Sequence, residues 1–102
     1  MNRGEVYSHQ GLGRSGHVVI VSNDPFNAVT GQPLVVRISD RPDLAPGPYV
    51  IAMAGDDPVP GHAEAYSVLR VRRDRLGDKP AGCLSAHTMR ELAGALALLL
   101  DL

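Results

Sequence analysis

The chain has few of the residues that build aromatic cores, disulfide frameworks or metal clusters. Its 102 residues include no tryptophan, three tyrosines, one phenylalanine and one cysteine, Cys83. A single cysteine excludes an internal disulfide and any site with several cysteine ligands. With so few aromatic rings, the core must be built from valine, isoleucine and leucine. This length, with 44% hydrophobic residues, predicts one globular domain over residues 1–102.

An excess of one charge sign and a long apolar run are also absent. Ten lysines and arginines stand against eleven acidic residues, for a formal net charge of −1, whereas general polyanion binders are strongly basic. Nine of the ten are arginines, which suit phosphate; a GC-rich genome is the alternative explanation. The longest apolar run, residues 92–100, is far short of the roughly 20 residues that cross a bilayer. No secretion signal is visible, so we expect a cytoplasmic protein without a membrane partner.

Short strand-like runs, separated by glycine and proline, fill most of the chain. Five strands are predicted, at residues 6–8, 17–22, 32–39, 49–53 and 66–71, with loops at 23–31 and 55–62. Residues 73–77 predict one helical turn. Apolar residues at helical spacing predict an amphipathic helix over residues 86–100, with Ser85 as its N-cap. The expected fold is α+β but mostly β: a small antiparallel barrel with a C-terminal helix packed on it.

Several segments, taken in order, resemble the MazF/PemK toxins of bacterial type II toxin–antitoxin systems. They are RGEVY at residues 3–7, VVIVSN at 18–23, Phe26-Asn27, PLVVRIS at 33–39, residues 61–68, DRLG at 74–77 and the helix from Met89 to the end. The resemblance implies an SH3-like barrel that forms a homodimer. It also implies a sequence-selective endoribonuclease that cleaves single-stranded messenger RNA without metal or other cofactor. A cognate antitoxin with a disordered C-terminal tail would neutralise it.

Such cleavage uses the ribose 2′-hydroxyl as nucleophile, so the site must move protons and neutralise charge on the phosphate. The family has Arg-Pro just before its second strand, where this chain has Gly16-His17. Arg14 and His17 are the predicted replacements, and Ser39 matches the family's hydroxyl residue at the end of the third strand. The predicted catalytic set is therefore Arg14, Ser39 and His17. The alternatives are a solvated arginine, a strand-edge histidine and a serine that closes a turn. None of the four histidines has the spacing of a metal site.

RNA-binding residues are predicted on the neighbouring segments. Arg37 and Arg41 would contact phosphate, Asn23 would lie at the edge of the site, and Tyr66 would stack on a nucleobase. Glu64 is a candidate base. One branch of the family has an Arg and an Asp where this chain has Glu64 and Tyr66, so that acid–base pair is missing. Solvated charges, turn formation by Asn23 and packing of Tyr66 are the alternatives.

Two other functions follow from these departures. The missing Arg-Pro and Arg/Asp positions favour a catalytically weakened family member. A gyrase-binding toxin like CcdB shares the barrel, but CcdB-type tails contain tryptophan and this chain has none.

The leucines of the last helix exceed what one barrel face needs, and Leu98 lies off the main stripe. They predict a second, dimer-facing surface.

Overall fold

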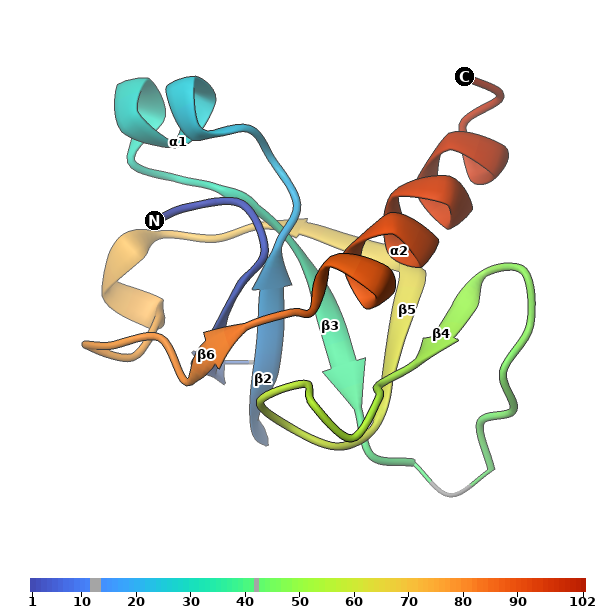
Figure 1. Ribbon diagram of the computed structural model, residues 1–102. Helices are drawn as coiled ribbons and strands as arrows, with labels where there is room; N and C mark the ends of the chain where they lie inside the picture. Colours follow the sequence, from blue (N-terminus) through green and yellow to red (C-terminus); the bar gives the residue numbers. More distant parts are fainter. Residues whose placement is uncertain (12–13, 42) are drawn as a thin grey trace.

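A six-stranded antiparallel sheet, curled into half of a barrel, forms the body of the protein in the computed structural model (Figure 1). The structure describes residues 1–11, 14–41 and 43–102; the side chains of residues 14 and 15 lie outside that description. The elements are β1 (Glu5–Gly11), β2 (Arg14–Ile20), α1 (Asp24–Thr30), β3 (Leu34–Ser39), β4 (Val50–Ala52), β5 (His62–Arg70), the 3-10 turn η1 (Arg73–Arg75), β6 (Gly82–Cys83) and α2 (Ala86–Leu99). Strand order is β4-β5-β3-β2-β1-β6. The predicted class, a mostly β antiparallel fold with a C-terminal helix, is confirmed.

Alternation along the strands divides the side chains between two apolar layers. Helix α2 crosses one side of the sheet (Figure 1). Val6 and Val19 lie on that side, in one core cluster with Leu92 of α2. Tyr7 and Val18 lie on the other side, in a separate cluster. We call these sides the helix face and the outer face. Because directly paired residues of neighbouring strands share a face, the pairing register assigns each residue of β1, β2 and β3 to one of them.

The first hairpin is longer than the sequence predicts. β1 and β2 pair from Val6 opposite Val19 to Gly11 opposite Arg14, with His9 opposite Gly16. The prediction of a glycine-rich connection between residues 8 and 17 was therefore wrong over most of its length. Hydrogen bonds across the ladder satisfy a glycine backbone as well as any other, so Gly11 and Gly16 continue the strands.

A short helix replaces the loop predicted at residues 23–31. The side chain of Asn23 caps α1 by accepting a hydrogen bond from the backbone N–H of Phe26 at 2.9 Å. Pro25 stands in the first turn, where its missing N–H has no cost. Asn27 is buried, and its Nδ2 donates to the carbonyls of Met1 at 3.2 Å and Ser22 at 3.1 Å. These bonds hold α1 against the first residue of the chain, Met1, and against Ser22 just before the helix.

The pairing of β3 with β5 is irregular in its middle. Val36 pairs with Val68 and Ile38 with Ala63, so Arg37 alone stands opposite residues 64–67. β5 begins at His62, earlier than the predicted residue 66. The two-residue strand β6, which the sequence did not predict, pairs with the start of β1. As a result Arg37 has no partner residue in the β5 ladder.

The C-terminal helix is confirmed close to its predicted bounds. Ser85 caps it by accepting a hydrogen bond from the N–H of Thr88 at 3.2 Å. The residues that α2 buries are Thr88, Leu92 and Ala95, which recur at the spacing of one helix face. Within residues 1–11, 14–41 and 43–102, no helix is both long and apolar enough to cross a membrane.

Candidate active site

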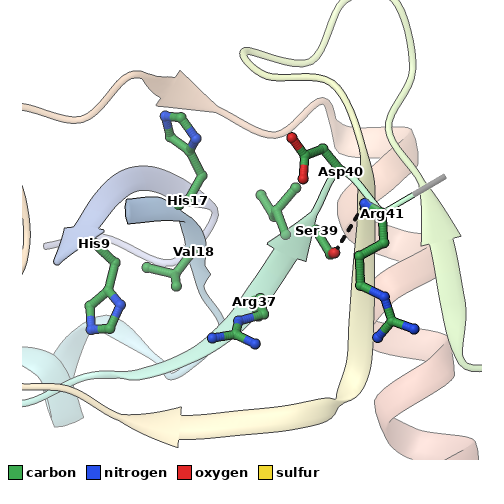
Figure 2. Close-up of a pocket in the computed structure, with 9 residues that line it drawn as sticks. His9, His17, Val18, Arg37, Ser39, Asp40 and Arg41 are labelled. Carbon is green, nitrogen blue, oxygen red and sulfur yellow. Dashed lines mark hydrogen bonds between the residues drawn. The ribbon is translucent and has the colours of Figure 1, made fainter. Parts of the chain in front are cut away.

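The beginning of β2 and the end of β3 border a small hollow at one end of the sheet. Its volume is about 80 Å³, and we call it the Ser39 hollow (Figure 2). Its lining residues come from β1, β2, β3 and the segment after β3: His9, Gly16, His17, Val18, Arg37, Ile38, Ser39, Asp40 and Arg41. The structure thus brings two members of the predicted catalytic set, Ser39 and His17, to one hollow, together with both predicted phosphate ligands.

The side chains around the hollow extend to both faces of the sheet. Figure 2 shows His9 and Arg37 on one side, and His17 and Asp40 on the other. The register agrees, because His17 pairs with the core residue Ile38 of the helix face. His17 also lines a second hollow of about 350 Å³, on the helix face. It therefore stands at the boundary between the two hollows.

Ser39 ends β3 with its side chain largely buried. Only 9% of the residue is exposed, and its Oγ accepts a hydrogen bond from the backbone N–H of Arg41 at 3.2 Å. A hydroxyl has one proton to donate in addition to its acceptor lone pairs. The turn-closing role foreseen as the alternative is therefore realised, and it leaves the hydroxyl proton available for a ligand in the hollow.

The two predicted phosphate ligands differ in how they are paired. The guanidinium of Arg41 donates to both carboxylate oxygens of Asp43, at 3.2 and 2.8 Å. This bond and the charge of Asp43 raise the pKa of Arg41, with smaller contributions from Glu64 and Tyr66. Arg37 makes no ion pair with any residue in the described part of the chain. Arg37 is the cation of this hollow that a phosphate meets without first displacing a carboxylate.

His9 lines the hollow although the sequence did not single it out. Partial burial lowers its pKa from the usual value of 6.5, and the charges of Arg37 and Arg75 lower it further. At neutral pH its imidazole is therefore mostly uncharged. The signal that would have revealed it is the hairpin register, which places His9 opposite Gly16. That register depends on how the glycine-rich residues pair, which their composition does not indicate.

Of the other predicted site residues, Asn23, Glu64 and Tyr66 do not line the hollow. The backbone of Arg14 begins β2 opposite Gly11, and its side chain falls outside the described residues. Asn23 caps α1, at the end of β2 away from the hollow. Glu64 pairs with Val50 of β4 and is 5% exposed. Tyr66 is 52% exposed, and its hydroxyl donates to Oε1 of Glu64 at 3.1 Å, so the ring is not a core residue.

No metal centre is formed by the residues that the structure describes. In that part of the chain, no three His, Cys, Asp or Glu side chains are placed to share an ion. One histidine nitrogen, Nδ1 of His62, is buried without a hydrogen-bond partner among those residues. His62 pairs with Ser39 across β3 and β5, so it adjoins the hollow through the backbone.

Comparison with known proteins relates the chain to one family. Residues 4–100 match the family described as PemK-like, MazF-like toxin of type II toxin–antitoxin system. An endoribonuclease in complex with its cognate antitoxin, from a mycobacterial species, is 30% identical, with a TM-score of 0.92 over 100% of this chain and 96% of that one. A mycobacterial endoribonuclease structure is also 30% identical, with a TM-score of 0.88 over 100% and 92%.

More distant structures share the fold. The MazE–MazF crystal structure from Deinococcus radiodurans is 18% identical, with a TM-score of 0.85 over 100% of this chain and 96% of that one. No curated protein sequence matches the chain significantly.

Proposed function

The chain belongs to the PemK-like, MazF-like toxins of type II toxin–antitoxin systems, and from this premise we propose that it is an endoribonuclease that cleaves single-stranded messenger RNA in the cytoplasm. One observation carries the proposal: the whole chain is 30% identical to an endoribonuclease with the same fold. The contents of the Ser39 hollow support it. A hydroxyl, an arginine without an ion pair among the described residues and two imidazoles meet there, which is a set suited to phosphodiester chemistry.

The proposed reaction is attack by the ribose 2′-hydroxyl on the adjacent phosphate. The nucleophile is already part of the substrate, so proton transfer and charge stabilisation suffice and no metal is needed. The Ser39 hydroxyl would donate a hydrogen bond to a non-bridging phosphate oxygen, and Arg37 would neutralise the charge that builds there. His17 would protonate the departing 5′-oxygen. Arg14 would add a second guanidinium from the beginning of β2.

RNA beyond the scissile phosphate would contact the flanking predicted residues. Arg41 would bind a phosphate after exchanging Asp43 for it, since the two anions compete for one fork of donors. Tyr66 offers an exposed ring on which a base can stack, and the Glu64 carboxylate orients its hydroxyl. Asn23, the helix cap, would act only if RNA extends to the other end of the sheet. Selectivity for a short RNA sequence would arise from these contacts.

Two protein partners complete the proposal. The first is a second copy of the chain, because Leu98 and Leu100 at the end of α2 are 56% and 61% exposed. The second is a cognate antitoxin whose disordered C-terminal tail wraps the dimer and blocks the RNA site. The mycobacterial endoribonuclease in complex with its cognate antitoxin supports such a partner.

The test is cleavage of a defined single-stranded RNA by the purified protein in EDTA. We expect discrete cuts with 2′,3′-cyclic phosphate ends, and no cut where the nucleotide 5′ to the scissile bond is 2′-deoxy. Ser39→Ala should lose about 10²–10³-fold in rate, the usual effect of losing one such donor. Ser67→Ala, on β5 outside the hollow, should leave the rate unchanged. Inhibition of gyrase without RNA cleavage would instead favour the CcdB-like alternative and overturn the proposal.

A further inference from the structure

His9 faces an open part of the Ser39 hollow. It lies on the outer face, directly opposite Gly16 in the β1–β2 ladder. Gly16 has no side chain, and a Cβ built there would meet no other atom within 4 Å. A side chain at the facing position would normally cover the imidazole, so its absence leaves room for a reactant beside His9.

The backbone of His9 is held from two sides. On one side it pairs with β2, and on the other it forms an isolated bridge with Leu76, just after η1. Its side chain lines the Ser39 hollow and also a third hollow of about 370 Å³, bordered by residues of the end of β5 and of η1. His9 is thus held between these two hollows, and its side chain lines both of them.

The charged groups around His9 favour its neutral form. Arg37 of β3 and Arg75 of η1 supply positive charge. Arg70 and Arg72 border the third hollow, where Arg72 is paired with Asp74. The one carboxylate among the residues lining these two hollows, Asp40, extends to the opposite side of the sheet (Figure 2). A neutral imidazole between arginines can accept a proton at neutral pH, and those arginines also attract a phosphate to it.

We propose that His9 is a catalytic residue, the general base that removes the proton from the ribose 2′-hydroxyl at the Ser39 hollow; this inference rests on the function proposed above. The O2′–H bond breaks as the proton passes to the imidazole, and O2′ forms a bond to phosphorus. The bond from phosphorus to O5′ breaks, and O5′ takes a proton from His17. Water then carries the proton from His9 back to His17, and both side chains regain their starting forms.

The arrangement of the two imidazoles suits this division of roles. In-line displacement places the attacking and leaving oxygens on opposite sides of phosphorus. His9 and His17 line one hollow but extend to opposite sides of the sheet (Figure 2). Ser39 and Arg37 share the outer face with His9 by strand alternation, so the nucleophile would be activated on the side where the phosphate is bound.

The first test is the pH dependence of kcat/KM for cleavage of a single-stranded RNA, from pH 5 to 9. For the wild-type protein we expect a rise with an inflection below pH 6.5, where the free His9 loses its proton. His9→Gln should lower the rate about 10²–10⁴-fold, the range for general acid–base groups, and should abolish that inflection. His17→Gln should be slower but keep the inflection. His87→Gln, exposed on α2, should behave as wild type.

The second test needs neither cleavage nor a variant. The imidazole resonance of His9 is followed by NMR in the wild-type protein while a 2′-deoxy oligonucleotide of the same sequence is added. We expect a midpoint below pH 6.5 in the free protein and a change in this resonance on binding. An unmoved resonance, or a folded His9→Gln protein with wild-type rate or inflection, overturns the role of His9. Failure of the wild-type protein to cut any RNA overturns the proposed function instead.

Discussion

Asp57 connects the segment between β4 and β5 to the beginning of α2, and its replacement by alanine should strongly destabilise the protein. Its Oδ1 accepts a hydrogen bond from the N–H of Ser85 at 2.8 Å. Its Oδ2 accepts from the N–H of Ala54 and from Oγ1 of Thr88, each at 2.6 Å. Thr88 is 1% exposed. One carboxylate therefore satisfies three donors and places negative charge at the N-terminus of α2, where the helix dipole favours it.

The expected loss follows from these contacts. Hydrogen bonds to a charged group contribute about 1.5–3 kcal/mol each when buried, and partial exposure of Asp57 reduces that figure. The hydroxyl of Thr88 also keeps its bond from Oγ of Ser85 at 2.9 Å. We therefore expect Asp57→Ala to cost about 3 kcal/mol in the free energy of unfolding. For 102 residues this corresponds to a fall of about 14 °C in Tm.

Acid should remove the stabilisation that the Asp57 carboxylate provides. Burial alone would raise the pKa of Asp57, but the hydrogen bonds from Thr88, Ser85 and Ala54 outweigh it, and the net pKa is lowered. A carboxyl whose folded pKa is lowered stabilises the fold at pH values above its unfolded pKa, about 3.9. This stabilisation is lost as the pH falls through the lower, folded value. Asp57→Asn should flatten this part of the stability–pH curve.

Urea and thermal unfolding at one fixed protein concentration measure both effects, since the dimer proposed above would make stability depend on concentration. Asp56→Ala is the matched control, because it removes a neighbouring carboxylate that is exposed. If Asp57→Ala and Asp56→Ala differ by less than about 0.5 kcal/mol, the size of an ordinary surface substitution, the role assigned to Asp57 is refuted. RNA cleavage should fall as well, since Val59 and Pro60 of the same segment border the second hollow.

Three further substitutions test the frame and the charge of the site. Gly61→Ala should cost about 1–3 kcal/mol and slow cleavage, because φ is +118° and the new Cβ would lie 2.5 Å from the carbonyl oxygen of Ser39; denaturation and cleavage assays check this. Asn27→Ala should cost about 2–3 kcal/mol in urea unfolding, because it removes the buried donor to the carbonyls of Met1 and Ser22. Arg37→Gln should weaken binding of an uncleavable oligonucleotide and reduce the slope of log Kd against log salt by about one. Arg90→Gln, exposed on α2, should change neither.

The sequence predicted the elements whose side chains follow a clear period. The helix at 86–99 has its apolar stripe and its Ser85 cap in the expected places, and the apolar runs at 17–22 and 32–39 contain most of β2 and β3. Elements whose residues show no hydrophobic periodicity were not predicted. α1 has only its Asn23 cap and Pro25 as signals, and these also describe a turn. β6 has two residues, too few for any alternation.

The site shows a second limit. Ser39 was identified through its resemblance to a family residue at the end of a strand, and Arg37 shares its strand and its face. His9 depends on a cross-strand register that no local pattern contains.

Local pairing of charges reconciles a net charge of −1 with the proposed binding of RNA. Arg41 and Arg72 are each bound to a nearby aspartate, so their positive charge is largely cancelled. Arg37 and Arg75 make no such pair among the described residues, and both act on His9. The positive fields of Arg37 and Arg75 therefore add where the Ser39 hollow and the third hollow meet, while acidic residues elsewhere balance the net charge. Since association with a polyanion depends on the local potential and not on the sum, binding should weaken steeply with salt.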